Sequence, residues 1–312
     1  MQSATATTTT PSRFRYFDIA ANLTSGMYAG YYKGQRGSMH APDLDDVLKR
    51  AHDVGCDRLL ITGSSYKDSQ GCLDIAMKSD KYYCTVGVHP TRVNDIDKFG
   101  GQERYFKNME KLIEKCGDKC VAIGECGLDY DRLMCSEKET QLKYFPVHFA
   151  LAEKYNKPLY LHDRNSGGDF YKLMKENRHR FSTGVVHTFT GTEDELNKYL
   201  SLDLYIGVSG CSLKKKHNME VVKKIPLDRL MIETDCPYCE INKSYDSFSL
   251  VKTPFPSRYP EQYQKGCKVK SRNEPCTIVQ IAEVVSALNK VDIKDLTEIT
   301  YENTMKFFNL KE

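Results

Sequence analysis

The sequence feature that most limits which fold this chain can adopt is a regular alternation of short apolar segments with longer helical patterns. Eight segments have the length and composition of buried strands, at residues 13–23, 58–62, 82–88, 121–123, 158–162, 183–187, 204–208 and 229–233. Parallel strands need long crossover connections, and the helical patterns between these segments provide them. Eight such units in 312 residues favour a closed barrel over an open sheet. The predicted fold class is therefore α/β, as a single (β/α)8 TIM barrel.

Helical spacing fills the intervals between these strands. The predicted helices cover residues 42–54, 67–79, 103–116, 137–155, 169–177, 193–200 and 220–224, and two more, at 277–288 and 293–308, close the chain. No glycine-rich phosphate fingerprint follows the first strand, which argues against a dinucleotide-binding fold. We expect a disordered tail at residues 1–12, because it is rich in Ser and Thr, and one domain at 13–312. Residues 240–275 lack periodicity and are expected to form a long loop over the catalytic face.

The amino-acid composition limits how this protein can bind nucleic acid or a membrane and indicates the cellular compartment in which it works. A formal net charge of +3 is close to neutral, so any affinity for nucleic acid must come from a local patch. The first residues lack the pattern of a signal peptide, and no apolar run reaches membrane-spanning length. We therefore expect an intracellular protein, in the cytoplasm or nucleus, with reduced thiols. Cys236 and Cys239 have the spacing of a redox dithiol, but they follow the eighth strand, and we interpret them as packing and loop structure.

Chemistry in such barrels takes place at the carboxyl ends of the strands. Six polar residues lie at or close to the ends of predicted strands: Asp18, His89, Glu125, His162, His187 and Asp235. Any one histidine after a strand could be an ordinary hydrogen-bonded loop residue. The barrel, however, places all six on one rim. Two imidazoles and two carboxylates on one rim predict a divalent-metal site.

The predicted metal ligands are Glu125, His162, His187 and Asp235. Such a site lowers the pKa of a bound water and so generates a nucleophile near neutral pH. The carboxylate of Glu125 could bridge two cations. Asp235 could bind metal, accept the proton of the attacking water, or do both, and His89 is a candidate contact for a phosphate or a leaving group. Asp235 and His89 are thus the predicted catalytic residues.

Basic residues suggest two nucleic-acid contacts. One is the run at residues 214–216, and the other is the segment 252–272, where cations are interleaved with aromatic rings. We expect weak substrate contacts from Lys252 and Arg272 in this segment, and from Arg164 after the fifth strand. A solvated basic loop with no ligand is the alternative interpretation of the segment.

Five motifs carry a resemblance to a known family. They are GVHP (87–90), GECGLDY (124–130), LHDR (161–164), VHTFTG (186–191) and ETDCPY (233–238), and they resemble those of TatD metal-dependent deoxyribonucleases in family order. The stretch KVKSRNEPC (268–276) is similar to the eukaryotic branch. The resemblance implies a barrel of the metal-dependent hydrolase type that cuts DNA as a 3′–5′ exonuclease, with endonuclease activity in some members. It also implies one or two ions of Mg²⁺, Mn²⁺ or Zn²⁺, no organic cofactor and no membrane partner.

The first strand departs from the family pattern. Many members carry Asp-x-His-x-His there, whereas this chain has Asp18, Ala20 and Asn22 at those positions, as in the eukaryotic branch. The missing imidazoles weaken the expectation of a tightly held second metal. Two other functions remain open on the same barrel. One is a metal-dependent hydrolase of a small amide, lactone or aminoacyl ester, and the other is a non-catalytic member that binds nucleic acid or protein.

Overall fold

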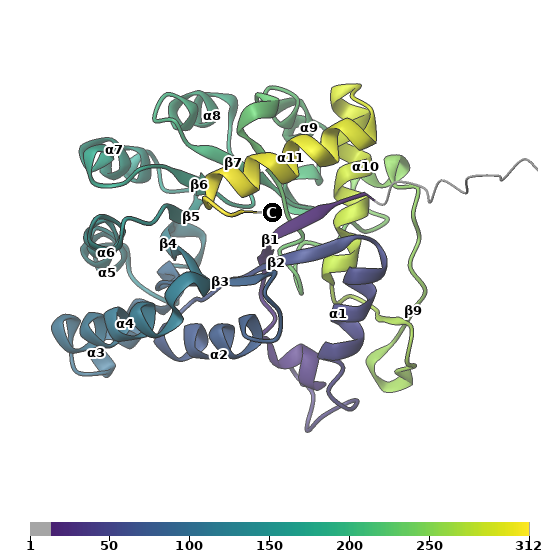
Figure 1. The fold of residues 1–312 in the computed structure, drawn as a ribbon, viewed down its shortest axis with the longest axis horizontal. Coiled ribbons are helices and arrows are strands. Elements are labelled where there is room, and N and C mark those ends of the chain that lie inside the picture. Colours follow the sequence, from purple (N-terminus) through teal and green to yellow (C-terminus); the bar gives the residue numbers. More distant parts are fainter. Residues whose placement is uncertain (1–13, 312) are drawn as a thin grey trace, which may run out of the picture.

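Eight parallel strands arranged in chain order form a barrel in the computed structural model, which describes residues 14–311 (Figure 1). The strands are β1 (Tyr16–Ala21), β2 (Cys56–Ile61), β3 (Tyr82–Val86), β4 (Cys120–Asp129), β5 (Leu159–Arg164), β6 (Gly184–Val186), β7 (Tyr205–Val208) and β8 (Leu230–Ile232). A parallel bridge between Ala21 and Cys236 joins the first strand to the segment after the last. The predicted (β/α)8 barrel is therefore confirmed, while the predicted tail at 1–12 lies outside the described residues.

Helices cover the outside of the barrel. They are α1 (Leu44–Asp53), α2 (Tyr66–Ala76), α3 (Asn94–Lys98), α4 (Gln102–Cys116), α5 (Lys138–Tyr144), α6 (Val147–Tyr155), α7 (Asp169–Glu176), α8 (Glu193–Leu200), α9 (Lys216–Val222), α10 (Ile278–Asn289) and α11 (Ile293–Phe307). The single helix expected at 137–155 is divided into α5 and α6 around Pro146, which has no backbone N–H to continue the ladder. None of the helices within 14–311 combines the length and apolar character needed to cross a bilayer.

Two apolar cores hold this architecture together. Residues between the strands and the outer helices form the larger core. The second fills the barrel, where Phe17, Leu60 and Val121 point inward and meet Tyr301 and Met305 of α11. In Figure 1 α11 lies across the ring of strands. One end of the barrel is thus sealed by apolar side chains, which leaves the carboxyl ends of the strands as the place for a polar site.

The segment 240–275 lies beside the barrel, against α1 and α10. It contains short helical turns at Asp246–Leu250 and Pro260–Gln262 and a two-stranded ribbon of β9 (Ser257–Arg258) and β10 (Lys268–Val269), and a third turn, Pro275–Thr277, begins at its last residue. The Tyr263 hydroxyl donates to Asp46 of α1, and the Lys252 N–H donates to Glu283 of α10. No described residue of this segment lines the cavity at the strand ends. The expected position over the catalytic face is therefore not supported.

Arg272 is a structural residue rather than a surface contact for substrate. Its side chain is fully buried, and its guanidinium donates two hydrogen bonds to Asp43, at 2.7 and 2.6 Å, and one to Glu274 at 2.9 Å. Arg50 of α1 also donates to Glu274, at 2.7 Å. Two cations and two carboxylates thus join α1 to the start of α10. The prediction that Arg272 contacts substrate is wrong, because its charge is already satisfied inside the protein.

We predict that Arg272→Ala lowers the free energy of unfolding by about 3–5 kcal/mol, because it leaves two buried carboxylates, Asp43 and Glu274, with only Arg50 to compensate them. Guanidinium unfolding followed by circular dichroism would measure the loss. Lys270→Ala is the control, since Lys270 is exposed two residues away and its removal should cost no more than about 0.5 kcal/mol. A loss below about 1 kcal/mol for Arg272→Ala would contradict the structural role.

Candidate active site

Glu125 projects from a bulge in the middle of β4. The strand continues to Asp129, well beyond the three residues expected from the sequence. Gly124 pairs with Tyr160 of β5 and Cys126 with Leu161, so Glu125 is the extra residue between two consecutive pairs. A bulge of this kind redirects one side chain without ending the strand. The carboxylate is consequently held by rigid backbone, with the Glu125 N–H donating to the carbonyl of Gly63 at 2.9 Å.

Glycines on both sides of Glu125 allow β4 to approach its neighbours. Gly124 and Gly127 have φ angles of 150° and 148°, which side chains rarely tolerate. A Cβ atom at Gly124 would lie 2.1 Å from the carbonyl oxygen of Tyr160, and one at Gly127 would lie 1.8 Å from that of His162. The glycines are therefore required for close packing of backbones around the site.

Three imidazole rings converge on one oxygen of Glu125. Its Oε1 lies 2.7 Å from Nε2 of His187, 3.0 Å from Nδ1 of His162 and 3.4 Å from Nε2 of His89. The Nδ1 of His162 and the Nε2 of His187 are themselves only 3.3 Å apart. The structure thus brings together four of the residues predicted from the strand ends.

Two further carboxylates flank this cluster, and the sequence analysis did not single them out. Asp129 lies 3.3 Å from Nε2 of His162, and Glu233 lies 3.5 Å from Nδ1 of His187. Both acids are buried, and Glu233 also accepts a hydrogen bond from the Thr188 hydroxyl at 2.6 Å. A carboxylate behind a histidine fixes the orientation of the ring in metal sites. The signal was present in the sequence, since both acids lie inside motifs that were identified.

The charges of the cluster compensate one another. Burial alone would raise the pKa of Glu125, but the charge of His187 and the hydrogen bonds from His162 and His187 hold it well below its usual value. Burial alone would lower the pKa of His187, yet Glu125 and Glu233 raise it well above the usual range. Glu125 therefore stays ionised although it is buried, and His187 beside it is held in its protonated form. Nitrogen and oxygen donors in this arrangement are compatible with a divalent metal ion, including the group formed by His89, Glu125 and His162.

His89 presents a neutral N–H to the cavity. Its Nδ1 accepts the backbone N–H of Thr91 at 3.1 Å, which leaves the proton on Nε2. Burial lowers the pKa of His89 to about 3, against the opposing charge of Glu125. The ring is thus a hydrogen-bond donor over the whole physiological pH range.

Asp235 lies in the same cavity but apart from the histidine cluster. Its Oδ1 accepts a hydrogen bond from the Asn22 amide at 2.9 Å. The preceding residue, Thr234, donates its N–H to Asp18 at 2.9 Å and its hydroxyl at 2.5 Å. Asp18 therefore positions the turn that carries Asp235 rather than entering the site. Burial raises the pKa of Asp235 to about 7 against the charge of His187, so its carboxylate can exchange protons near neutral pH.

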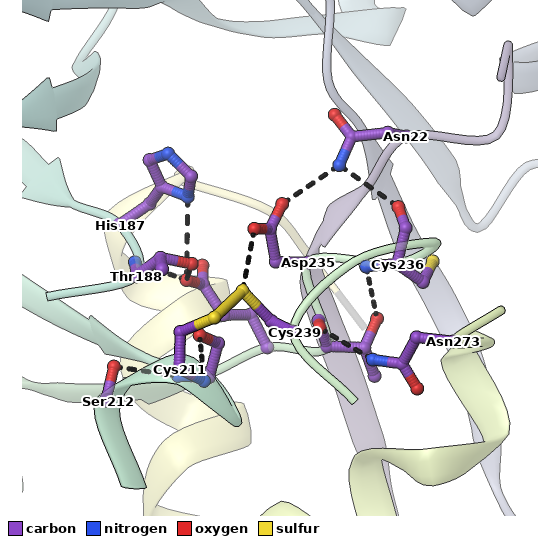
Figure 2. The surroundings of a disulfide bond; sticks show 12 residues. Asn22, His187, Thr188, Cys211, Ser212, Asp235, Cys236, Cys239 and Asn273 are labelled. Atoms are coloured by element: carbon purple, nitrogen blue, oxygen red, sulfur yellow. Dashed lines mark hydrogen bonds and ion pairs between the residues drawn. A yellow bond between two sulfur atoms is a disulfide. The ribbon is translucent and has the colours of Figure 1, made fainter. Parts of the chain in front are cut away.

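A disulfide bond lies directly against Asp235 (Figure 2). It joins Cys211, after β7, to Cys239, with the two Cα atoms 5.0 Å apart. The Cys239 sulfur is 3.2 Å from Oδ2 of Asp235. The expectation of free thiols throughout is therefore wrong for this pair, because the barrel brings Cys211 next to Cys239. Cys236 is buried and free, which agrees with the packing role predicted for it.

A cavity of about 540 Å³ surrounds these groups at the carboxyl ends of the strands. Its lining includes His89, Glu125, His162, His187 and Asp235, together with three arginines, Arg92, Arg132 and Arg164. The predicted contact Arg164 thus lies at the site, 3.5 Å from Asp131. Lys252 has an exposed side chain outside the cavity lining. The arginines give the mouth of an otherwise acidic site a positive surface.

Comparisons with known proteins agree on one family. The model of the family described as TatD related DNase matches residues 17–309. Deoxyribonuclease Tat-D of Schizosaccharomyces pombe is 36% identical over 95% of this chain and 96% of its own length. The 3′-5′ ssDNA/RNA exonuclease TatD of Erwinia tasmaniensis is 33% identical over 94% and 100% of the two chains. A crystal structure of a TatD family hydrolase from Entamoeba histolytica superposes with a TM-score of 0.87 at 38% identity, covering 94% of this chain and 98% of that one.

We predict that Glu233→Gln weakens Mn²⁺ binding by about 10- to 100-fold, the usual effect of losing an acid that orients a metal-binding histidine. The amide can still accept from Thr188, but it no longer attracts charge onto His187. Isothermal titration calorimetry would measure the affinity, and Glu220→Gln on the exposed face of α9 is the matched control. Equal Mn²⁺ affinity in the two variants would show that Glu233 does not orient His187.

Proposed function

We propose, because this chain belongs to the TatD family of deoxyribonucleases, that its cavity hydrolyses DNA phosphodiester bonds with the help of one or two divalent cations. The observation that carries the proposal is the convergence of three imidazoles on the buried oxygen of Glu125, inside a cavity with arginines at its mouth. The name of the Erwinia tasmaniensis relative favours 3′–5′ exonuclease action, with endonuclease activity as a further possibility.

Glu125, His162, His187 and Asp235 would hold the cation, with Glu125 able to serve two. Mg²⁺, Mn²⁺ and Zn²⁺ are the candidates, since the donors are a mixture of nitrogen and oxygen. A bound divalent cation would polarise the phosphoryl oxygen and lower the pKa of water. His162 and His187 are held in position for this role by Asp129 and Glu233.

The remaining steps belong to the chain's own residues. Asp235 would accept the proton of the water that attacks phosphorus, while Asn22 holds the carboxylate in place. The neutral Nε2–H of His89 would donate to a phosphoryl oxygen or to the leaving group. Arg164 and Arg132 would neutralise the phosphates as the strand enters. The bond from phosphorus to the sugar oxygen would break as the bond to the water oxygen forms, and the leaving oxygen would take up a proton from solvent to become a sugar hydroxyl while Asp235 returns its proton to solvent.

Glu125→Ala is expected to reduce cleavage of end-labelled DNA by at least about a thousandfold, because it removes the oxygen at the centre of the site. The assay would compare Mg²⁺, Mn²⁺, Zn²⁺ and a chelator, and the wild-type protein should lose activity in the chelator. Glu176→Ala, an exposed carboxylate of α7, is the control and should retain activity. Near-normal cleavage by folded Glu125→Ala would contradict the role of Glu125 at the centre of a nuclease site. If the wild-type protein binds DNA without cutting it, the non-catalytic alternative is favoured.

Substitution of the arginines separates DNA from a small amide, lactone or aminoacyl ester as substrate. We expect Arg132→Ala and Arg164→Ala each to weaken DNA binding and to lower the slope of log K against log salt by about 1, because each removes one phosphate contact. Lys175→Ala on the exposed face of α7 is the control. Unchanged DNA affinity and salt slope in both arginine variants would favour the small-substrate hydrolase.

A further inference from the structure

A second cavity of about 310 Å³ lies beside the active site. Its walls are aromatic: Tyr66 at the start of α2, Phe99 after α3 and Tyr105 of α4. Phe99 is 38% exposed, and Tyr66, which lines the same cavity, is partly exposed as well. An exposed ring of this kind beside a polar site suggests that something else packs on it.

The three rings hold one another in a fixed arrangement. The ring centre of Phe99 lies 5.6 Å from that of Tyr66 and 5.5 Å from that of Tyr105, with interplanar angles of 60° and 83°. The rings therefore meet edge to face rather than as a stack. Tyr105 is buried, and its hydroxyl accepts the N–H of Tyr66 at 2.8 Å. The guanidinium carbon of Arg104 lies over the Phe99 ring, 5.6 Å from its centre, and the rest of that ring is the accessible part of the platform that the three rings form.

Two chain segments connect this cavity to the active site. Arg92 lines both cavities, and it is three residues from His89. Ser64 lines the active-site cavity, and the next residues, Ser65 and Tyr66, line the second one. Three residues span at most about 11 Å. Arg92 therefore lies within about 11 Å of His89, and one extended molecule that contacts Arg92 can occupy parts of both cavities.

The charge around the aromatic walls suits a polyanion. Lys67, Arg92 and Lys98 line the cavity against a single carboxylate, Asp95. The Arg92 side chain is about half exposed and lies 3.1 Å from Asp95, which leaves the two lysines to face solvent and ligand. Cations next to aromatic faces are the usual combination for binding single-stranded nucleic acid, since the phosphates meet the cations while the bases stack.

We propose that this second cavity is a nucleobase subsite, in which Phe99 stacks on a base of the substrate strand close to the scissile phosphate while Lys67 and Lys98 contact the adjacent phosphates. The inference rests on the proposed function for its substrate class and deepens it. A single strand fits the site better than a duplex does, because a base that stacks on protein must leave its own stack. The subsite would thus position the strand end relative to Glu125 and Asp235.

An abasic scan tests the subsite directly. Fluorescently labelled 12-nucleotide single strands, each lacking one base at a different position, would be bound to the full-length wild-type and Phe99→Ala proteins in chelator, with affinity read from anisotropy. We expect Phe99→Ala to weaken binding of the intact strand about tenfold, within the range for loss of one base–aromatic stack. Removal of one particular base should weaken wild-type binding to a similar extent, yet leave Phe99→Ala unaffected.

Two variants control for structural effects. Phe99→Trp retains an aromatic face and should restore both the affinity and the sensitivity to the missing base. Phe248→Ala removes a phenylalanine of similar exposure, 37%, that lines neither cavity, and it should bind as the wild type does. Unchanged affinity in Phe99→Ala, or the same abasic profile in Phe99→Ala and wild type, would overturn the subsite. Failure of the proposed function would give a different result. The wild type would then cut no DNA with any metal, yet the missing base would still weaken binding by the wild type and not by Phe99→Ala.

Discussion

The catalytic end of this barrel depends on the burial of one carboxylate. An isolated buried charge is very costly, so Glu125 can be held in β4 only because positive charge surrounds it. Acids and imidazoles alternate around Glu125, so that each of two rings lies between two acids. In order, the chain is Asp129, His162, Glu125, His187 and Glu233. Under the proposed function, a bound cation would take the place of the protons in this chain and would be held by the same side chains. Pre-organisation of the site and its affinity for positive charge therefore have the same physical origin.

Much of this arrangement could be predicted from the sequence. The period of the apolar segments identifies the barrel, and the barrel then places residues after the strands on one rim, which is why His89, Glu125, His162 and His187 were found together. The bulge at Glu125 could not be foreseen, because it depends on which residues of β4 and β5 pair, and a single sequence does not reveal register. Asp129 and Glu233 were missed for a related reason. Both stand at the ends of strands, Asp129 as the last residue of β4 and Glu233 directly after β8, but their role of orienting the rings follows from which histidine each one faces.

The errors concern groups whose partners are far away in the chain. Its place in a basic, aromatic segment predicts that Arg272 binds phosphate. The residue is instead fully buried, and its partner Asp43 is 229 residues away in the chain. Cys211 and Cys239 are 28 residues apart and belong to different strand ends, so nothing in their spacing indicates a bond. Composition reports how many charges and thiols a segment contains. Only tertiary packing determines which of them face solvent and which face one another.

On the first strand, Ala20 and Asn22 occupy the positions where the resemblance leads one to expect two histidines, and Asn22 makes contacts of its own. Asn22 donates from its amide to Asp235, and its carbonyl accepts the hydroxyl of Thr62 at 2.6 Å. The space next to Asp235 is thus lined by oxygen and amide groups, whereas the nitrogen donors are concentrated around Glu125. A cation near Asp235 would meet mainly oxygen ligands, which suit Mg²⁺ or Mn²⁺, while the imidazole side suits a metal that prefers nitrogen. Under the proposed function, a cation near Asp235 and a cation near the imidazoles would therefore meet different donor atoms and be held with different affinity.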